Sequence, residues 1–154
     1  MTVRTSVSFL VLLLIAGGAT SAAATTVPSM SPSQLIEAAD IVVDGVVIRS
    51  ETRWVGQRII TFLTVLSGAG PSLTSTQIAV PGGVVGTFAQ VVPGTPKLEV
   101  GGRYRFYLGA PAGPRLDGGG PTRGIVGLFR GVFAVDDLGR ARPFGEDGLP
   151  VVVR

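Results

Sequence analysis

Short apolar runs alternate along this chain with glycine- and proline-rich turns, a pattern that favours strands over helices. The β-branched and aromatic residues concentrate in these runs, as they do in strands. The pattern predicts strands at 41–50, 58–66, 76–80, 103–108, 125–129 and 132–135, with an edge strand at 151–153.

Two of these segments differ in how their apolar residues are spaced. Segment 103–108 alternates cleanly, so we expect one face of this strand to be buried and the other to be wet. The inward side chains should be Tyr104, Phe106 and Leu108, and the outward ones Arg103, Arg105 and Tyr107. Segment 41–50 has apolar residues on both faces, which predicts a strand deep in a barrel or sandwich, with a bend or bulge at Gly45.

One helix is expected ahead of the strands. Ser31 is a good N-cap, Pro32 suits the first helical position, and Gln34 completes a capping box. The helix should end near Asp40. One short helix followed by five to seven antiparallel strands predicts a mainly-β fold, either a small OB-like barrel or a sandwich.

Three connections complete this predicted domain. Residues 110–123 form a loop rich in glycine and proline, and residues 136–139 are typical of a hairpin turn with Gly139 in the left-handed position. Residues 144–154 form a C-terminal tail. We expect residues 25–154 to be a single domain, since about 130 residues is an ordinary domain size.

The first 24 residues predict a signal peptide. Arg4 precedes the apolar core 9–19, which is followed by the small-residue run 21–24. The core has eleven residues, whereas a membrane span needs about 18 or more. We therefore expect cleavage near Thr25 and export to the periplasm or the cell exterior, with no stable membrane insertion afterwards. Retention as an N-terminal anchor is the alternative.

The charge balance disfavours a nucleic-acid partner. Removing residues 1–24 takes away Arg4, so 13 basic residues become 12 against 10 acidic ones, a net charge of +2. Segment 103–107 interleaves arginines with aromatic residues, but its aromatic side chains at 104 and 106 are predicted to point inward. No nucleic-acid binding is expected.

Composition also excludes most catalytic chemistry. The chain has no histidine and no cysteine, so a Ser-His-Asp triad, a cysteine nucleophile, a disulfide and a typical zinc site are all ruled out. Paired carboxylates remain for hydrolytic or calcium chemistry, namely Asp40 with Asp44, Asp136 with Asp137, and Glu146 with Asp147. Such residues are more typical of turns. We predict no enzyme activity, no metal and no cofactor.

The candidate binding residues lie in two places. Gly82, Gly83, Gly86 and Gln90 belong to a glycine-dense loop that lacks the ending of a phosphate-binding loop. Its glycines either supply positive φ or let a ligand approach the backbone. Trp54, the one tryptophan, either anchors a partner or folds back onto the domain.

Two blocks of sequence resemble known families. Residues 39–47 (ADIVVDGVV) and the glycine-rich stretch from Val80 to Leu108 resemble small exported bacterial β-domains of unassigned function. The first block and Gly101–Leu108 are also similar to the netrin-module and tissue-inhibitor-of-metalloproteinase OB barrels. This second resemblance implies the barrel alone, because inhibition in that class uses an N-terminal cysteine that this chain lacks.

The sequence therefore predicts an exported, non-catalytic binding module whose partner is a protein or a glycan outside the cytoplasm. The alternatives are a carboxylate-dependent hydrolase acting on glycans and a structural component of the cell envelope. A structural component would assemble through an edge strand such as 151–153.

Overall fold

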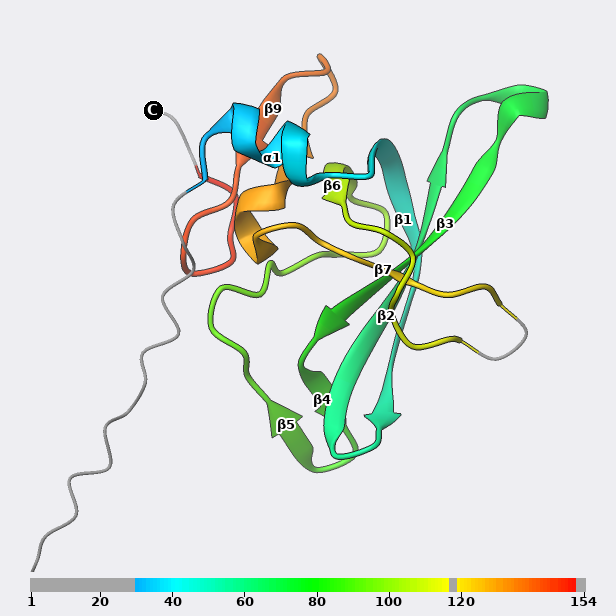
Figure 1. Cartoon of the computed structure of the whole chain (residues 1–154), viewed down its shortest axis with the longest axis vertical. Coiled ribbons are helices and arrows are strands. Elements are labelled where there is room, and N and C mark those ends of the chain that lie inside the picture. Colours follow the sequence, from blue (N-terminus) through cyan, green and yellow to red (C-terminus); the bar gives the residue numbers. More distant parts are fainter. Residues whose placement is uncertain (1–29, 117–118, 152–154) are drawn as a thin grey trace, which may run out of the picture.

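The computed structural model describes residues 30–116 and 119–151, and Figure 1 shows their arrangement. In this part of the chain one α-helix precedes nine strands, and two short 3₁₀ helices interrupt them. The elements are α1 (Pro32–Ala38), β1 (Ile41–Val55), β2 (Arg58–Ser67), η1 (Gly70–Ser72), β3 (Thr74–Pro81), β4 (Gly83–Val85), β5 (Phe88–Gln90), β6 (Arg103–Leu108), β7 (Arg123–Gly124), η2 (Leu128–Gly131), β8 (Val132–Val135) and β9 (Ala141–Pro143). The fold is mainly β, as predicted.

Seven of these strands form one sheet, in the order β7-β3-β2-β1-β6-β8-β9. The expected all-antiparallel barrel is wrong, because β7 runs parallel to β3 and the sheet is not closed. A single bridge joins Leu108 at the end of β6 to Ile125, and Val126 N–H donates to the Tyr107 carbonyl at 2.9 Å. The ladder stops there because the chain turns at Gly127, whose φ is +63°.

Strand β1 organises this sheet. Its first half pairs with β6 and its second half with β2, and the register shifts between Val47 and Arg49. The bend was expected at Gly45, but the shift in register lies beyond that residue. The strand buries one face only: Val43 and Val47 are buried, whereas Val42 and Ile48 are exposed. The prediction of a strand buried on both faces was therefore wrong.

The core lies on the inner face of the large sheet. The alternation predicted for β6 is confirmed, since Tyr104, Phe106 and Leu108 are buried. They pack with residues from β1, β2, β3 and β8 and from the segments that follow β7 and β9. The buried cluster comprises Val43, Val47, Leu63, Val65, Ile78, Val80, Tyr104, Phe106, Leu108, Phe129, Val132 and Phe144.

The predicted helix is confirmed with its capping box. Ser31 Oγ accepts from Gln34 N–H at 3.3 Å, and Gln34 Oε1 accepts from Ser31 N–H at 2.8 Å. These two bonds satisfy backbone donors that have no partner inside the helix. Leu35 is the buried residue of α1.

Segment 125–129 is not the expected strand. Gly127 and Leu128 both have positive φ, and the 3₁₀ helix η2 follows at once. The strands predicted near 58–66, 76–80 and 132–135 are confirmed, and so is the hairpin turn that joins β8 to β9.

Both chain ends lie partly outside the described residues. The predicted signal peptide (1–24) falls there entirely, as does most of the predicted edge strand 151–153. Among the residues described, no helix has the length and apolar character that crossing a bilayer requires.

Candidate functional site

The glycine-dense segment predicted as a binding loop is a small hairpin, β4–β5, that lies against β1 and β2. Gly83 has φ +133°, and a Cβ added there would lie 2.5 Å from Thr61 Oγ1 and 2.6 Å from Thr52 Cγ2. A Cβ on Gly82 would lie 2.7 Å from the Gln90 carbonyl oxygen. These close approaches explain why two consecutive glycines begin the hairpin.

Hydrogen bonds hold this hairpin on β2. Ile59 N–H donates to Gln90 Oε1 at 2.7 Å, and Gly82 N–H donates to the Ile59 carbonyl at 2.8 Å. Thr61 Oγ1 donates to the Gly82 carbonyl at 2.8 Å and lies 3.0 Å from Thr52 Oγ1. The hairpin is therefore a fixed wall, built from backbone and small polar side chains.

A cleft of about 510 Å³ lies between this wall and the segment 91–97, and we call it the hairpin cleft. Its volume is within the range of small-ligand sites, about 300–1,000 Å³. Most of its surface is apolar. The cleft is lined by Pro81, Gly82, Gly83, Val84, Ala89, Gln90, Val91, Val92, Pro93, Gly94, Thr95, Pro96, Lys97, Glu146 and Asp147.

A second hollow of about 190 Å³ adjoins the hairpin cleft, with which it shares Gly82, Gly83, Thr95 and Pro96. It extends toward the core residues Leu63 and Val80 and is also lined by Thr61 and Leu98. The second hollow therefore lies beside both the cleft and part of the core.

The wall opposite the hairpin is also anchored. Thr95 Oγ1 donates to the Pro81 carbonyl at 3.2 Å, Lys97 N–H donates to the Gly148 carbonyl at 2.8 Å, and Phe129 N–H donates to the Gly94 carbonyl at 3.0 Å. These bonds tie segment 91–97 to β3, to the tail after β9 and to η2. Because both walls are fixed from several directions, the cleft does not depend on a ligand to form it.

The predicted binding residues do not all meet at this cleft. Gly82, Gly83 and Gln90 line it, although the Gln90 side chain is engaged by Ile59. Gly86 lies in the hairpin turn, outside the lining. Trp54 packs edge-on against Phe88, with ring centroids 5.9 Å apart, so it lies at the hairpin tips rather than in the cleft. Ligand binding by these residues stays a prediction.

Sequence reasoning missed the far wall of the cleft. The sequence does indicate a loop in segment 91–97, because Pro93–Pro96 is rich in proline and glycine. Glu146 and Asp147 were noted only as a carboxylate pair, and nothing in the sequence indicated that they lie near the hairpin. Asp147 Oδ1 accepts from Leu149 N–H at 3.1 Å, which is the turn-capping role expected of an aspartate.

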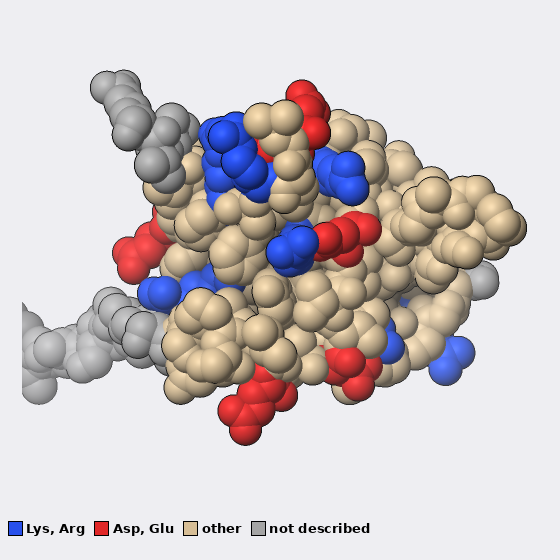
Figure 2. Space-filling view, turned by 90° about the horizontal axis from the view of Figure 1, so that it is seen from above, with Lys and Arg blue, Asp and Glu red and all other residues tan. Residues whose placement is uncertain are grey.

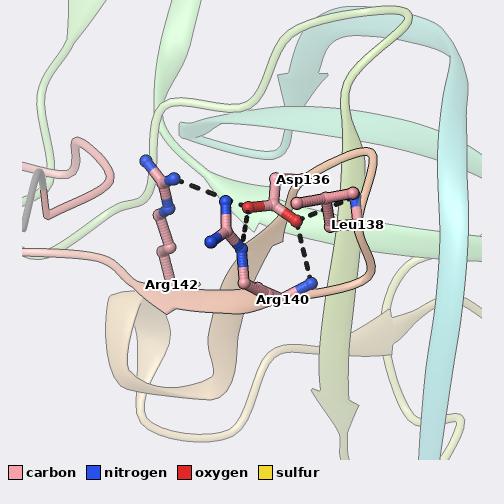
Figure 3. A network of polar contacts seen from close by, with 4 residues as sticks. All are labelled: Asp136, Leu138, Arg140 and Arg142. Atoms are coloured by element: carbon pink, nitrogen blue, oxygen red, sulfur yellow. Dashed lines mark hydrogen bonds and ion pairs between the residues drawn. The ribbon is translucent and has the colours of Figure 1, made fainter.

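The carboxylate pairs are separated from one another. Asp136 folds back on its own hairpin turn, where Oδ1 accepts from Leu138 N–H and Arg140 N–H, and Oδ2 accepts from Arg140 Nε at 2.8 Å (Figure 3). Asp44 accepts two hydrogen bonds from the Arg105 guanidinium, each 2.7 Å long, and Asp40 forms an ion pair with Arg123. Within 30–116 and 119–151 no three acidic side chains gather in a way that could hold a metal ion.

These contacts predict that the protein loses stability in acid. Hydrogen bonds from the Arg140 backbone and side chain hold the pKa of Asp136 below its ordinary value of 3.8, and the hydrogen bond from Arg105 does the same for Asp44. In the unfolded chain these carboxylates have ordinary pKa values and become protonated at a higher pH than in the folded protein. The stabilisation is therefore complete above about pH 4 and is lost as the pH falls through the lower pKa values of the folded state.

Asp136→Asn should therefore reduce the loss of stability between neutral and acidic pH. Urea denaturation at about pH 7 and about pH 3 measures that loss. Asp137→Asn, which changes the net charge equally in the same turn, is the control and should keep the wild-type loss. An equal loss in all three proteins would contradict the role assigned to Asp136.

Comparisons with protein-family models, with curated proteins and with solved structures found no match for this chain. The resemblances to exported bacterial β-domains and to netrin-type barrels therefore stay predictions, and the site is argued from its own geometry.

Proposed function

We propose that this chain is an exported, non-catalytic binding module that holds an apolar segment of a partner protein in the hairpin cleft. One observation carries the proposal: the cleft has an apolar wall, a volume of about 510 Å³, and two sides fixed by hydrogen bonds. Concave, largely apolar and preformed hollows are where proteins most often bind ligands.

The chemistry of the cleft favours a protein segment over a glycan. Sugar hydroxyls that leave water need hydrogen-bond partners. The Gln90 side-chain oxygen already accepts from Ile59, and the Thr95 hydroxyl already donates to the Pro81 carbonyl. An apolar side chain entering beside Val84, Ala89 and Pro96 needs no such partner.

The non-catalytic part of the proposal is supported by where the carboxylates lie. Asp40, Asp44 and Asp136 are each bound by an arginine. Glu146 and Asp147 reach the cleft, but they follow one another in a single turn and Asp147 is held by Leu149. No observation favours the glycan-hydrolase or envelope-component alternatives over binding.

Export completes the proposal. Export rests on the composition of residues 1–24.

Ala89→Phe tests the cleft by filling it. We expect the fluorescent probe 1-anilinonaphthalene-8-sulfonate to bind the wild-type protein and to lose at least about tenfold in affinity with this variant, because a ring occupies the hollow. Leu73→Phe is the matched control, since Leu73 is exposed in the β2–β3 connection, and it should bind as wild type does.

Equal probe affinity in the wild-type and Ala89→Phe proteins would contradict binding in the cleft. Failure of the wild-type protein to bind any probe would contradict the apolar character of the site and would favour a glycan. Far-UV circular dichroism of both variants checks that the fold is retained.

A further inference from the structure

The tips of the β1–β2 and β4–β5 hairpins form a second surface, which we call the hairpin tips (residues 53–58 and 84–89). Both hairpin turns lie at the same end of the molecule, at the bottom of Figure 1. Trp54 is 46% exposed and Phe88 is 63% exposed, and their rings meet edge-to-face. Two large aromatic side chains thus project together from one end of the domain.

The charged residues next to Trp54 along the chain are basic. No acidic residue occurs between Glu51 and Glu99 along the chain. The Arg53 guanidinium lies over the Phe62 ring, so the exposed basic residue of this turn is Arg58. Glu51, the nearest acidic residue before the tip, is paired with Arg49 at 2.9 Å. The opposite end of the molecule, seen in Figure 2, shows acidic and basic side chains interspersed.

Stability does not account for this exposure. Trp54 and Phe88 lie outside the buried core cluster, so the packing of the core does not require either ring. The hairpin cleft does not use them either, since neither residue lines it. We therefore expect the hairpin tips to bind a partner of their own.

We propose that the hairpin tips dock reversibly on the surface of a membrane that contains anionic lipids. Tryptophan and other amphipathic aromatic residues favour the interface between headgroups and acyl chains, and an exposed arginine such as Arg58 attracts anionic headgroups. The two turns are convex, which suits insertion between lipids better than it suits a protein groove.

This docking does not depend on ligand binding in the cleft. It is a peripheral contact through two hairpin turns and adds no membrane-spanning segment. A few apolar side chains together with basic residues give binding that responds to lipid charge and to salt.

The single tryptophan provides a direct test. The full chain is titrated with vesicles of phosphatidylcholine alone or of equal parts phosphatidylcholine and phosphatidylglycerol, while Trp54 emission is recorded. We expect a blue shift, with quenching by brominated acyl chains, only with the anionic vesicles. Because the readout is local to Trp54, vesicle binding by the apolar N-terminal residues does not produce it.

Two variants and one control sharpen the test. Arg58→Glu reverses one charge and should weaken vesicle affinity by more than about tenfold, since each basic residue near an anionic surface contributes about fivefold. Phe88→Ser should abolish the quenching, whereas Leu73→Ser, at an exposed leucine in the β2–β3 connection, should preserve it.

Three outcomes would overturn the proposal. These are vesicle binding without any change in Trp54 emission, an equal blue shift with neutral vesicles, and wild-type quenching in Arg58→Glu. Protection of Trp54 by a protein partner in the absence of any vesicle response would assign the hairpin tips to a protein instead.

Discussion

Gly83→Ala is expected to displace the β4–β5 hairpin from β2 and to abolish probe binding in the hairpin cleft. The added Cβ would lie 2.5 Å from Thr61 Oγ1, and the backbone at φ +133° is strained for any other residue. Strain and overpacking each cost about 1–3 kcal/mol. Urea denaturation and titration with 1-anilinonaphthalene-8-sulfonate measure the two effects on the same sample.

Gly86→Ala is the matched control for this substitution. Gly86 also has positive φ, +59°, but a Cβ there would meet nothing within 4 Å. The variant should lose about 1–2 kcal/mol from the backbone conformation and should keep its probe affinity. Equal losses of affinity in the two variants would mean that crowding against Thr61 does not position the hairpin.

Phe106→Ala is expected to cost about 3–5 kcal/mol of the free energy of unfolding, the range for a buried phenylalanine. The Phe106 side chain is fully buried in β6 and contacts Tyr104, with ring centroids 5.8 Å apart. Domains of this kind have about 5–15 kcal/mol in total, so the variant should lose a large share of the wild-type stability. Thermal and urea denaturation followed by circular dichroism provide the measurement.

Phe88→Ala is the control for this second substitution, because it removes the same side chain from an exposed position. We expect a loss of about 1 kcal/mol, mainly from the ring contact with Trp54. A similar cost for the two phenylalanines would contradict the assignment of Phe106 to the core and of Phe88 to a surface kept for binding.

Local signals predicted the parts of the fold that depend on neighbouring residues. The capping box around Ser31 and Gln34 fixed the start of α1, and the alternation in β6 identified its buried face. In both cases the determining contacts span only a few residues. Local chemistry alone is enough to predict such elements.

Features that depend on distant pairing were missed. The parallel contact of β7 with β3 involves two residue pairs, such as Ile78 with Arg123, that are far apart along the chain. In β1 the alternation gave no indication that Val42 and Ile48 would be exposed, since they are as apolar as their buried neighbours. Residues 125–129 have strand-forming composition, but positive φ at Gly127 and Leu128 overrides it.

Only one of the two walls of the candidate site was predicted from the sequence. The glycine-dense segment identified the hairpin wall, because consecutive glycines are typical of a close backbone approach. The opposing wall at 91–97 and the turn at 146–147 join it only in the folded chain. For the same reason Gln90, singled out as a ligand-binding residue, proves to bond to Ile59.

The binding function is tested most directly by nuclear magnetic resonance of the ¹⁵N-labelled protein titrated with 1-anilinonaphthalene-8-sulfonate. We predict saturable shifts of the backbone amides that line the hairpin cleft, above all Val84, Ala89, Val92 and Lys97, with no change at the β2–β3 connection. Shifts scattered over the surface, or confined to residues outside the cleft, would contradict the account.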